Sequence, residues 1–133
     1  MKKIDTIETA AQAAALFRAA LPKEQKEERL FVLPLDGNGN VLAKPILVSV
    51  GHQDCTTAID PGTIFREALK VGAEEIIVAH NHPSGVLTPS KGDLAATKEL
   101  KDLAARLGVA FVDHIILGAS ALGYVSLAEK GLL

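Results

Sequence analysis

Two histidines and an aspartate in one short stretch offer the ligands of a metal site. His80 and His82 stand two residues apart, and Asp93 follows at the start of a predicted helix. In extended backbone, alternate side chains share a face, so both imidazoles can reach one ion. Two neutral imidazoles and one carboxylate suit Zn²⁺ with a water in the fourth position, as in catalytic zinc sites. Such an ion lowers the pKa of its water to about 7, which makes hydroxide available at neutral pH.

Each of these residues also has a structural interpretation. A lone histidine is more often a surface or hydrogen-bonded core residue than a ligand. Ser90 and Asp93 form a Ser-x-x-Asp capping box for the helix that follows them, which needs no metal. The joint pattern of His-x-His-Pro, six residues, and Ser-x-x-Asp favours a metal site, because it is hard to obtain by chance.

The hydrophobic pattern predicts the elements that position these residues. Strands are expected over 30–35, 41–50, 75–79, 111–117 and 124–127, and helices over 6–21, 61–71 and 90–107. The first helix would begin at a capping box of Asp5 or Thr6 with Glu8. The dense turn signal at 36–40 predicts a hairpin, and Pro45 places its second strand at an edge or a bulge. Helices between strands favour an α/β fold with a mixed β-sheet flanked by helices.

Length and composition exclude several classes of protein. The chain has 133 residues, of which 48% are hydrophobic, so we expect a folded domain rather than a disordered chain. Its net charge of −2 does not favour a protein that grips a nucleic-acid backbone, because such domains usually carry a basic excess. Cys55 is the one cysteine and cannot form an internal disulfide. Since no apolar run approaches the length of a membrane span, we expect a cytoplasmic protein without a membrane partner.

The stretch from His80 to Asp93 resembles the JAMM motif of the JAB/MPN domains. The form His-Asn-His-Pro-Ser-Gly followed by Pro-Ser-x-x-Asp is most similar to the RadC branch of these domains. Further matches are Glu28, Thr97 and the pair Asp113-His114 with the Ile-Ile-Leu-Gly that follows it.

The resemblance covers residues 26–133, and 1–25 are expected to form an N-terminal helix and a charged connector. It implies a cytidine-deaminase-like, three-layer architecture in which helices flank a mixed sheet. It also implies Zn²⁺ as the cofactor, bound by His80, His82 and Asp93.

The resemblance implies two catalytic residues as well. In JAMM enzymes a glutamate on an upstream strand is the general acid/base, and Glu28 best matches it; such proton transfer is worth ~10²–10⁴-fold. Glu27 is the competing register, and strand alternation puts Glu28 on the side of Leu30. A solvated charge is the structural alternative. Ser90 matches the family serine that donates to the oxyanion, and it can do this while capping the helix.

These residues together predict a zinc-dependent hydrolase of the JAMM metallopeptidase or isopeptidase type. It would cleave an amide bond of a peptide or an isopeptide-bearing protein by attack of metal-bound hydroxide. One alternative is a DNA-repair-associated RadC function on DNA, although hydroxide attack on phosphorus usually recruits two metals or cationic clamps. Another is a non-catalytic JAB/MPN interaction module.

Four further side chains have two interpretations each. His114 beside Asp113 either orients a ligand imidazole or packs inside as a hydrogen-bonded strand residue. His52 and Cys55 either supply an extra ligand or are a solvated histidine and an inert thiol in a polar loop.

Overall fold

A computed structural model of the chain describes residues 4–51, 60–119 and 123–133. Its elements are, in chain order, α1 (Ala10–Ala20), β1 (Glu28–Leu35), β2 (Ile46–Gly51), α2 (Pro61–Lys70), β3 (Glu75–Asn81), α3 (Lys91–Arg106), β4 (Ala110–Leu117) and β5 (Tyr124–Ser126). The strands form one sheet in the order β2-β1-β3-β4-β5. β3 and β4 run parallel, and the other neighbouring pairs are antiparallel. The sheet is therefore mixed, as predicted.

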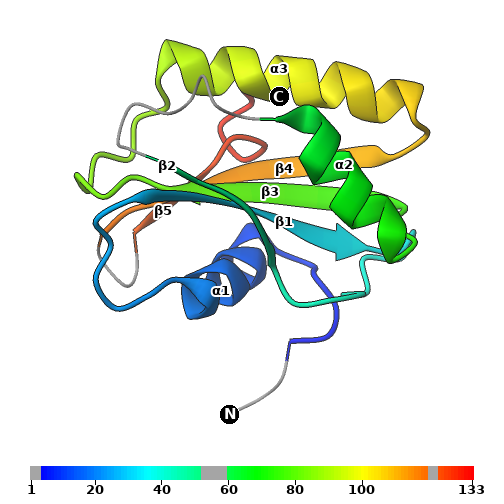
Figure 1. Cartoon of the computed structure of the whole chain (residues 1–133), viewed down its shortest axis with the longest axis horizontal. Helices are drawn as coiled ribbons and strands as arrows, with labels where there is room; N and C mark the ends of the chain where they lie inside the picture. The colour runs from blue at the N-terminus through cyan, green and yellow to red at the C-terminus, as the bar shows by residue number, and fades with distance from the viewer. Residues whose placement is uncertain (1–3, 52–59, 120–122) are drawn as a thin grey trace.

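The molecule has three layers, because helices cover both faces of the sheet (Figure 1). On one face, Phe17 of α1 packs in a buried cluster with Phe31 of β1. On the other face, Phe65 of α2 and Leu100 of α3 share a buried cluster with Val78 of β3. The predicted α/β class and its three-layer arrangement are thus confirmed. The division of the chain at residue 25 stays a prediction.

The first helix begins later than predicted. α1 starts at Ala10, and Thr9 and Gln12 form its capping box. The predicted start at residue 6 is wrong because the backbone there pairs with the hairpin turn instead: the Ile7 N–H donates to the Gly39 carbonyl at 2.8 Å. A long-range pairing has therefore replaced a local capping signal.

The predicted hairpin of β1 and β2 is confirmed, with a shorter second strand. Asp36 organises the turn, because its carboxylate accepts the backbone N–H groups of Asn38 and Asn40 at 2.8 and 2.9 Å. β2 begins at Ile46 rather than at residue 41, since Pro45 has no N–H to offer a ladder. β2 lies at the edge of the sheet, as that proline predicts.

The connection from β3 through α3 to β4 brings the end of a strand close to the start of a helix. Parallel strands need a crossover, and here α3 provides it, capped by Ser90. β3 runs as far as Asn81, so that His80 still lies in the strand. The carboxyl end of β3 thus leads into the amino end of α3 through one loop. Among the helices of the described ranges, none has the length and apolar character needed to cross a bilayer.

Candidate metal centre

Four predicted site residues come together at one end of the sheet. His80 and His82 stand at the carboxyl end of β3, and Asp93 lies in the first turn of α3. Glu28 opens the neighbouring strand β1. His80, Asp93 and Glu28 are buried, and Asp93 is only 1% exposed. Charged and titratable groups are seldom buried together without a partner or an ion, so this cluster points to a function.

The three predicted ligands are spaced as the ligands of one small ion. The Nε2 atoms of His80 and His82 are 2.9 Å apart. His80 Nε2 lies 3.2 Å from Asp93 Oδ1, and His82 Nε2 lies 3.3 Å from Asp93 Oδ2. Two ligand atoms bound at 2.0–2.1 Å to a tetrahedral ion are about 3.3 Å apart. The cluster is therefore close to the size that tetrahedral Zn²⁺ requires.

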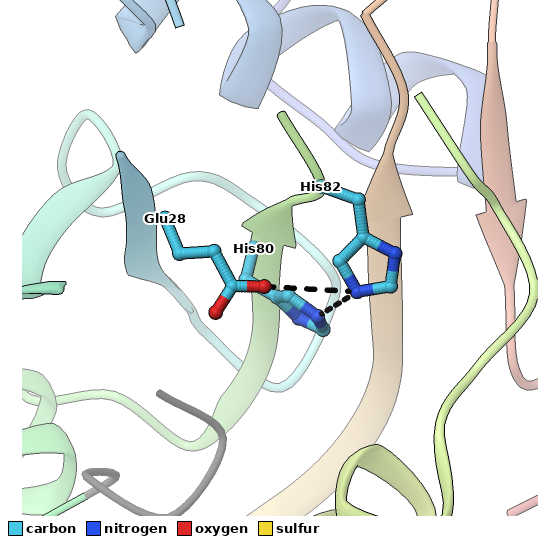
Figure 2. Close-up of side chains that lie close together, drawn as sticks. All are labelled: Glu28, His80 and His82. Atoms are coloured by element: carbon cyan, nitrogen blue, oxygen red, sulfur yellow. Dashed lines mark hydrogen bonds and ion pairs between the residues drawn. The ribbon is translucent and has the colours of Figure 1, made fainter. Parts of the chain in front are cut away.

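Glu28 approaches the same cluster from the next strand. Its Oε1 lies 3.9 Å from His82 Nε2, and Figure 2 shows its carboxylate facing the two imidazoles. Alternation along β1 places it on the face of Leu30, as predicted. Glu27, the competing register, is exposed and lies 3.8 Å from Arg29 in an ion pair. Ligand atoms of Glu28, His80 and His82 lie within 4.8 Å of one another, which defines a second possible ligand set.

A buried chain of hydrogen bonds from Thr97 through His114 to His80, called the relay below, fixes the tautomer of His80. The Thr97 hydroxyl donates to the Asp93 carbonyl at 2.7 Å, so its oxygen must accept from His114 Nδ1, which lies 2.6 Å away. With its proton on Nδ1, His114 accepts at Nε2 from His80 Nδ1, at 2.7 Å. The proton of His80 is thus used on the side away from the cluster. Its Nε2 keeps a lone pair that faces the other ligands.

The loop after β3 fixes the tautomer of His82 in the same sense. His82 Nδ1 lies 2.6 Å from the Val86 carbonyl oxygen, which can only accept a proton. When its ring is neutral, His82 therefore also presents its Nε2 lone pair to the cluster. This hydrogen bond depends on the turn at Gly85, whose φ of 85° is a conformation that glycine adopts without strain.

Two nitrogen lone pairs and a carboxylate therefore face one point, where they would stabilise a bound cation. Two neutral imidazoles that both present acceptors cannot hydrogen-bond to each other across 2.9 Å. Asp93 Oδ1 is a buried oxygen without a well-formed hydrogen bond among the described residues. A metal ion bound by His80, His82 and Asp93 would satisfy all three groups, so the residues present fit the Zn²⁺ predicted from the sequence.

The electrostatics of the cluster favour a positive charge at its centre, either a proton or a metal ion. Burial opposes ionisation of Asp93, but the two histidines outweigh it and hold the pKa of this carboxyl well below its ordinary value. Asp93 in turn raises the pKa of His82, so a proton can occupy the cluster when no metal is bound. Burial lowers the pKa of His114 well below 6.5, which keeps that ring neutral and able to relay. The ionised Asp93 carboxylate therefore favours a positive charge beside it.

Ser90 forms the capping box that the sequence predicts, and its catalytic role stays a prediction. Its Oγ accepts the Asp93 N–H at 3.0 Å, and its own N–H donates to Asp93 Oδ2 at 2.9 Å. The capping box is therefore present, and it holds the ligand carboxylate toward His82. Ser90 is exposed, and its hydroxyl proton is not used by any hydrogen bond within the described part of the chain. That proton remains available to a ligand.

The neighbours Asp113 and His114 have different contacts: His114 lies beside the predicted ligand His80, whereas Asp113 bonds to the C-terminal part of the chain. His114 is fully buried behind His80, as the relay shows. Asp113 points elsewhere: its carboxylate accepts from the Ser126 hydroxyl and from the Ala128 N–H, which ties β5 and the C-terminal turn to β4. His52 and Cys55, the other pair with open roles, lie outside the described residues.

We expect replacement of His114 by phenylalanine to weaken zinc binding about 10- to 100-fold, as loss of an outer hydrogen bond to a ligand histidine typically does. Phenylalanine fills the same buried space but cannot accept the His80 Nδ1 proton. His114→Gln offers an amide oxygen for that proton and should recover part of the affinity. Competition with a coloured chelator measures both variants, with thermal melting as a check on folding. Wild-type affinity in His114→Phe would contradict this role.

Comparison with known proteins agrees with the family resemblance of the sequence. The family described as "RadC-like JAB domain" matches residues 7–132. A UPF0758 protein of Carboxydothermus hydrogenoformans is 42% identical over 108 residues, which are 81% of this chain and 46% of the relative. A UPF0758 protein of Coprothermobacter proteolyticus is 35% identical over 131 residues, which are 98% of this chain and 54% of the relative. The chain spans about half the length of these curated relatives.

Proposed function

Because the chain belongs to the family of RadC-like JAB domains, we propose that it is a zinc-dependent hydrolase of the JAMM type. Its substrate would be an amide bond in a peptide or in an isopeptide-linked protein. The observation that carries this proposal is the convergence of the His80 and His82 Nε2 lone pairs on the Asp93 carboxylate. When bound there, Zn²⁺ supplies a Lewis acid that acidifies a coordinated water and polarises a carbonyl.

The distances favour Asp93 over Glu28 as the third ligand. The Asp93 oxygens lie 3.2 and 3.3 Å from the two Nε2 atoms, whereas Glu28 Oε1 lies 3.9 Å from His82 Nε2. Glu28 is therefore left beside the ligand set rather than within it. A carboxylate in this place can take a proton at Oε1 from the attacking water and pass it to the leaving amine nitrogen.

Ser90 supports the proposal from the other side of Asp93. An amide carbonyl oxygen gains negative charge when its carbon is attacked, and a fixed donor at that oxygen stabilises the transition state. The Ser90 hydroxyl is held in place by the Asp93 N–H and keeps its proton for such a contact. We assign it this role beside Glu28.

Metal analysis combined with substrate screening tests the proposal. We expect purified protein to carry about one zinc per chain and to hydrolyse members of a peptide or isopeptide library. Chelation should abolish hydrolysis, and added zinc should restore it. Failure to bind zinc at micromolar concentration would contradict the proposal. Zinc binding without hydrolysis would favour a non-catalytic module, and metal-dependent nicking of DNA would favour the DNA-repair alternative.

A further inference from the structure

Asn81 is the one residue of the His-Asn-His stretch without a part in the proposed chemistry. It is fully buried, although an amide side chain is costly to bury without hydrogen bonds. Neither the sequence nor the proposed mechanism explains why an asparagine stands between the two histidines. Its hydrogen bonds provide the explanation.

The backbone ladder between β1 and β3 ends just before the site. Its last pair is Leu30 with His80, so the first residues of β1 extend beyond it. The side chain of Asn81 continues the contact there. Its Oδ1 accepts the Arg29 N–H at 2.7 Å, and its Nδ2 donates to the Glu27 carbonyl at 3.0 Å. One carboxamide thus takes the place of a missing pair of ladder hydrogen bonds.

These two hydrogen bonds hold the backbone on both sides of Glu28. With planar peptide units, fixing the groups before and after a residue fixes the direction of its Cα–Cβ bond, from which the side chain extends. On the other side, the ladder with the edge strand β2 pairs Glu28 with Gly51 and Arg29 with Val50. On the β3 side, the backbone around Glu28 is therefore held by Asn81, the residue between the two proposed histidine ligands.

An asparagine is well suited to this task. It offers an acceptor and two donors on a short stem, so it can receive one backbone N–H and donate to one backbone carbonyl at the same time. Aspartate has no donor at neutral pH, and serine is too short to reach both groups. The second donor hydrogen of Nδ2 faces Gln25 Oε1 at 3.4 Å, which extends the contact further along the chain.

We propose that Asn81 is a positioning residue for Glu28, which sets the place of the Glu28 carboxylate relative to the two imidazoles. Its catalytic meaning rests on the proposed function, whereas the positioning itself rests on geometry alone. A misplacement of about 1 Å at a reacting group can cost 10²-fold in rate. We therefore expect Asn81 variants to bind zinc normally and to catalyse poorly.

The test compares Asn81→Ser and Asn81→Asp with a matched control, Asp36→Ala. Serine removes both hydrogen bonds, while isosteric aspartate keeps the acceptor for Arg29 and removes the donor to Glu27. Asp36 likewise bonds backbone groups of two residues, because its carboxylate accepts the Asn38 and Asn40 N–H groups at the far end of β1. The control therefore loses comparable hydrogen bonds without affecting Glu28.

The position of Glu28 can be measured in three forms of the protein: cobalt-substituted, metal-free and turning over a substrate. In cobalt-substituted protein, paramagnetic relaxation of the Glu28 carboxyl carbon reports its distance from the metal. In metal-free protein, hydrogen exchange of the Arg29 amide and nuclear Overhauser contacts between Glu28 and the His82 ring report the same positioning. With a hydrolysed substrate, kcat should fall about 10²-fold in Asn81→Ser while KM and zinc affinity stay within a few-fold.

The expected result is weaker cobalt relaxation of Glu28 in both Asn81 variants, faster Arg29 exchange in Asn81→Ser, and no change in Asp36→Ala. Unchanged relaxation in both Asn81 variants, or an equal loss in Asp36→Ala, would overturn the inference. If the wild-type protein bound no metal, the proposed function would fail instead. The metal-free measurements would then still decide whether Asn81 positions Glu28.

Discussion

Replacing Glu28 with glutamine should leave zinc binding intact and lower kcat/KM for amide hydrolysis by about 10²- to 10⁴-fold, the usual value of a placed general acid/base. Glutamine has nearly the same shape and suits the buried position, but it cannot take a proton from water and return it to an amine. The measurement is steady-state kinetics on protein whose zinc content has been determined for each variant.

The neighbouring Glu27 provides the matched control for this prediction. It is exposed and lies beside Arg29, so Glu27→Gln should keep both zinc and turnover. Full turnover in Glu28→Gln would remove the general acid/base role from Glu28. Loss of zinc in that variant would show instead that Glu28 belongs to the ligand set, together with His80 and His82.

Replacing Asp93 with asparagine should remove zinc binding and hydrolysis together. Asparagine can still accept the Ser90 N–H through its amide oxygen, so the cap of α3 is largely kept while the charge is lost. We expect zinc affinity to fall by more than the 10- to 100-fold typical of outer hydrogen bonds, since a direct ligand is changed. Isothermal titration with zinc and thermal melting at fixed zinc concentration measure the effect.

The stabilisation expected in the melting experiment can be calculated from the zinc concentration and the Kd. A ligand present at 100 times its Kd stabilises the folded state by about 2.7 kcal/mol, so zinc should raise the Tm of the wild-type protein and not that of Asp93→Asn. Asp102→Asn is the control, because Asp102 is an exposed carboxylate on the same helix. Equal zinc-induced stabilisation of Asp93→Asn and wild type would exclude Asp93 as a ligand.

Much of the fold could be predicted from sequence because its signals are local. Apolar runs, capping residues and glycines marked most helices and strands, and the spacing of His80, His82 and Asp93 marked the candidate ligands. The start of α1 was wrong because residue 7 pairs with residue 39, a contact between distant segments that no local pattern shows. β2 was predicted too long, although Pro45 was a visible reason to begin the strand after it.

The parts of the site that sequence reasoning missed depend on backbone atoms or on strand register. The Val86 carbonyl that sets the His82 tautomer has no side chain to reveal it. The role of Asn81 follows from where the β1–β3 ladder ends. The sequence left His114 open between orienting a ligand and packing inside, and its contact with Thr97 requires α3 to lie against β4. The adjacent Asn81 was present in the motif, but only the register assigns it a task.

The three proposed ligands come from neighbouring parts of the chain, whereas Glu28 and His114 are brought in by strands far away in sequence. Contacts between near neighbours generally form early in folding, because they close short loops, and pairings of distant strands form later. By this general rule, the contacts between the end of β3 and the start of α3 form before the pairing of β1 with β3. The proposed ligands therefore share one short stretch of chain, whereas the proposed acid/base joins them only when β1 pairs with β3.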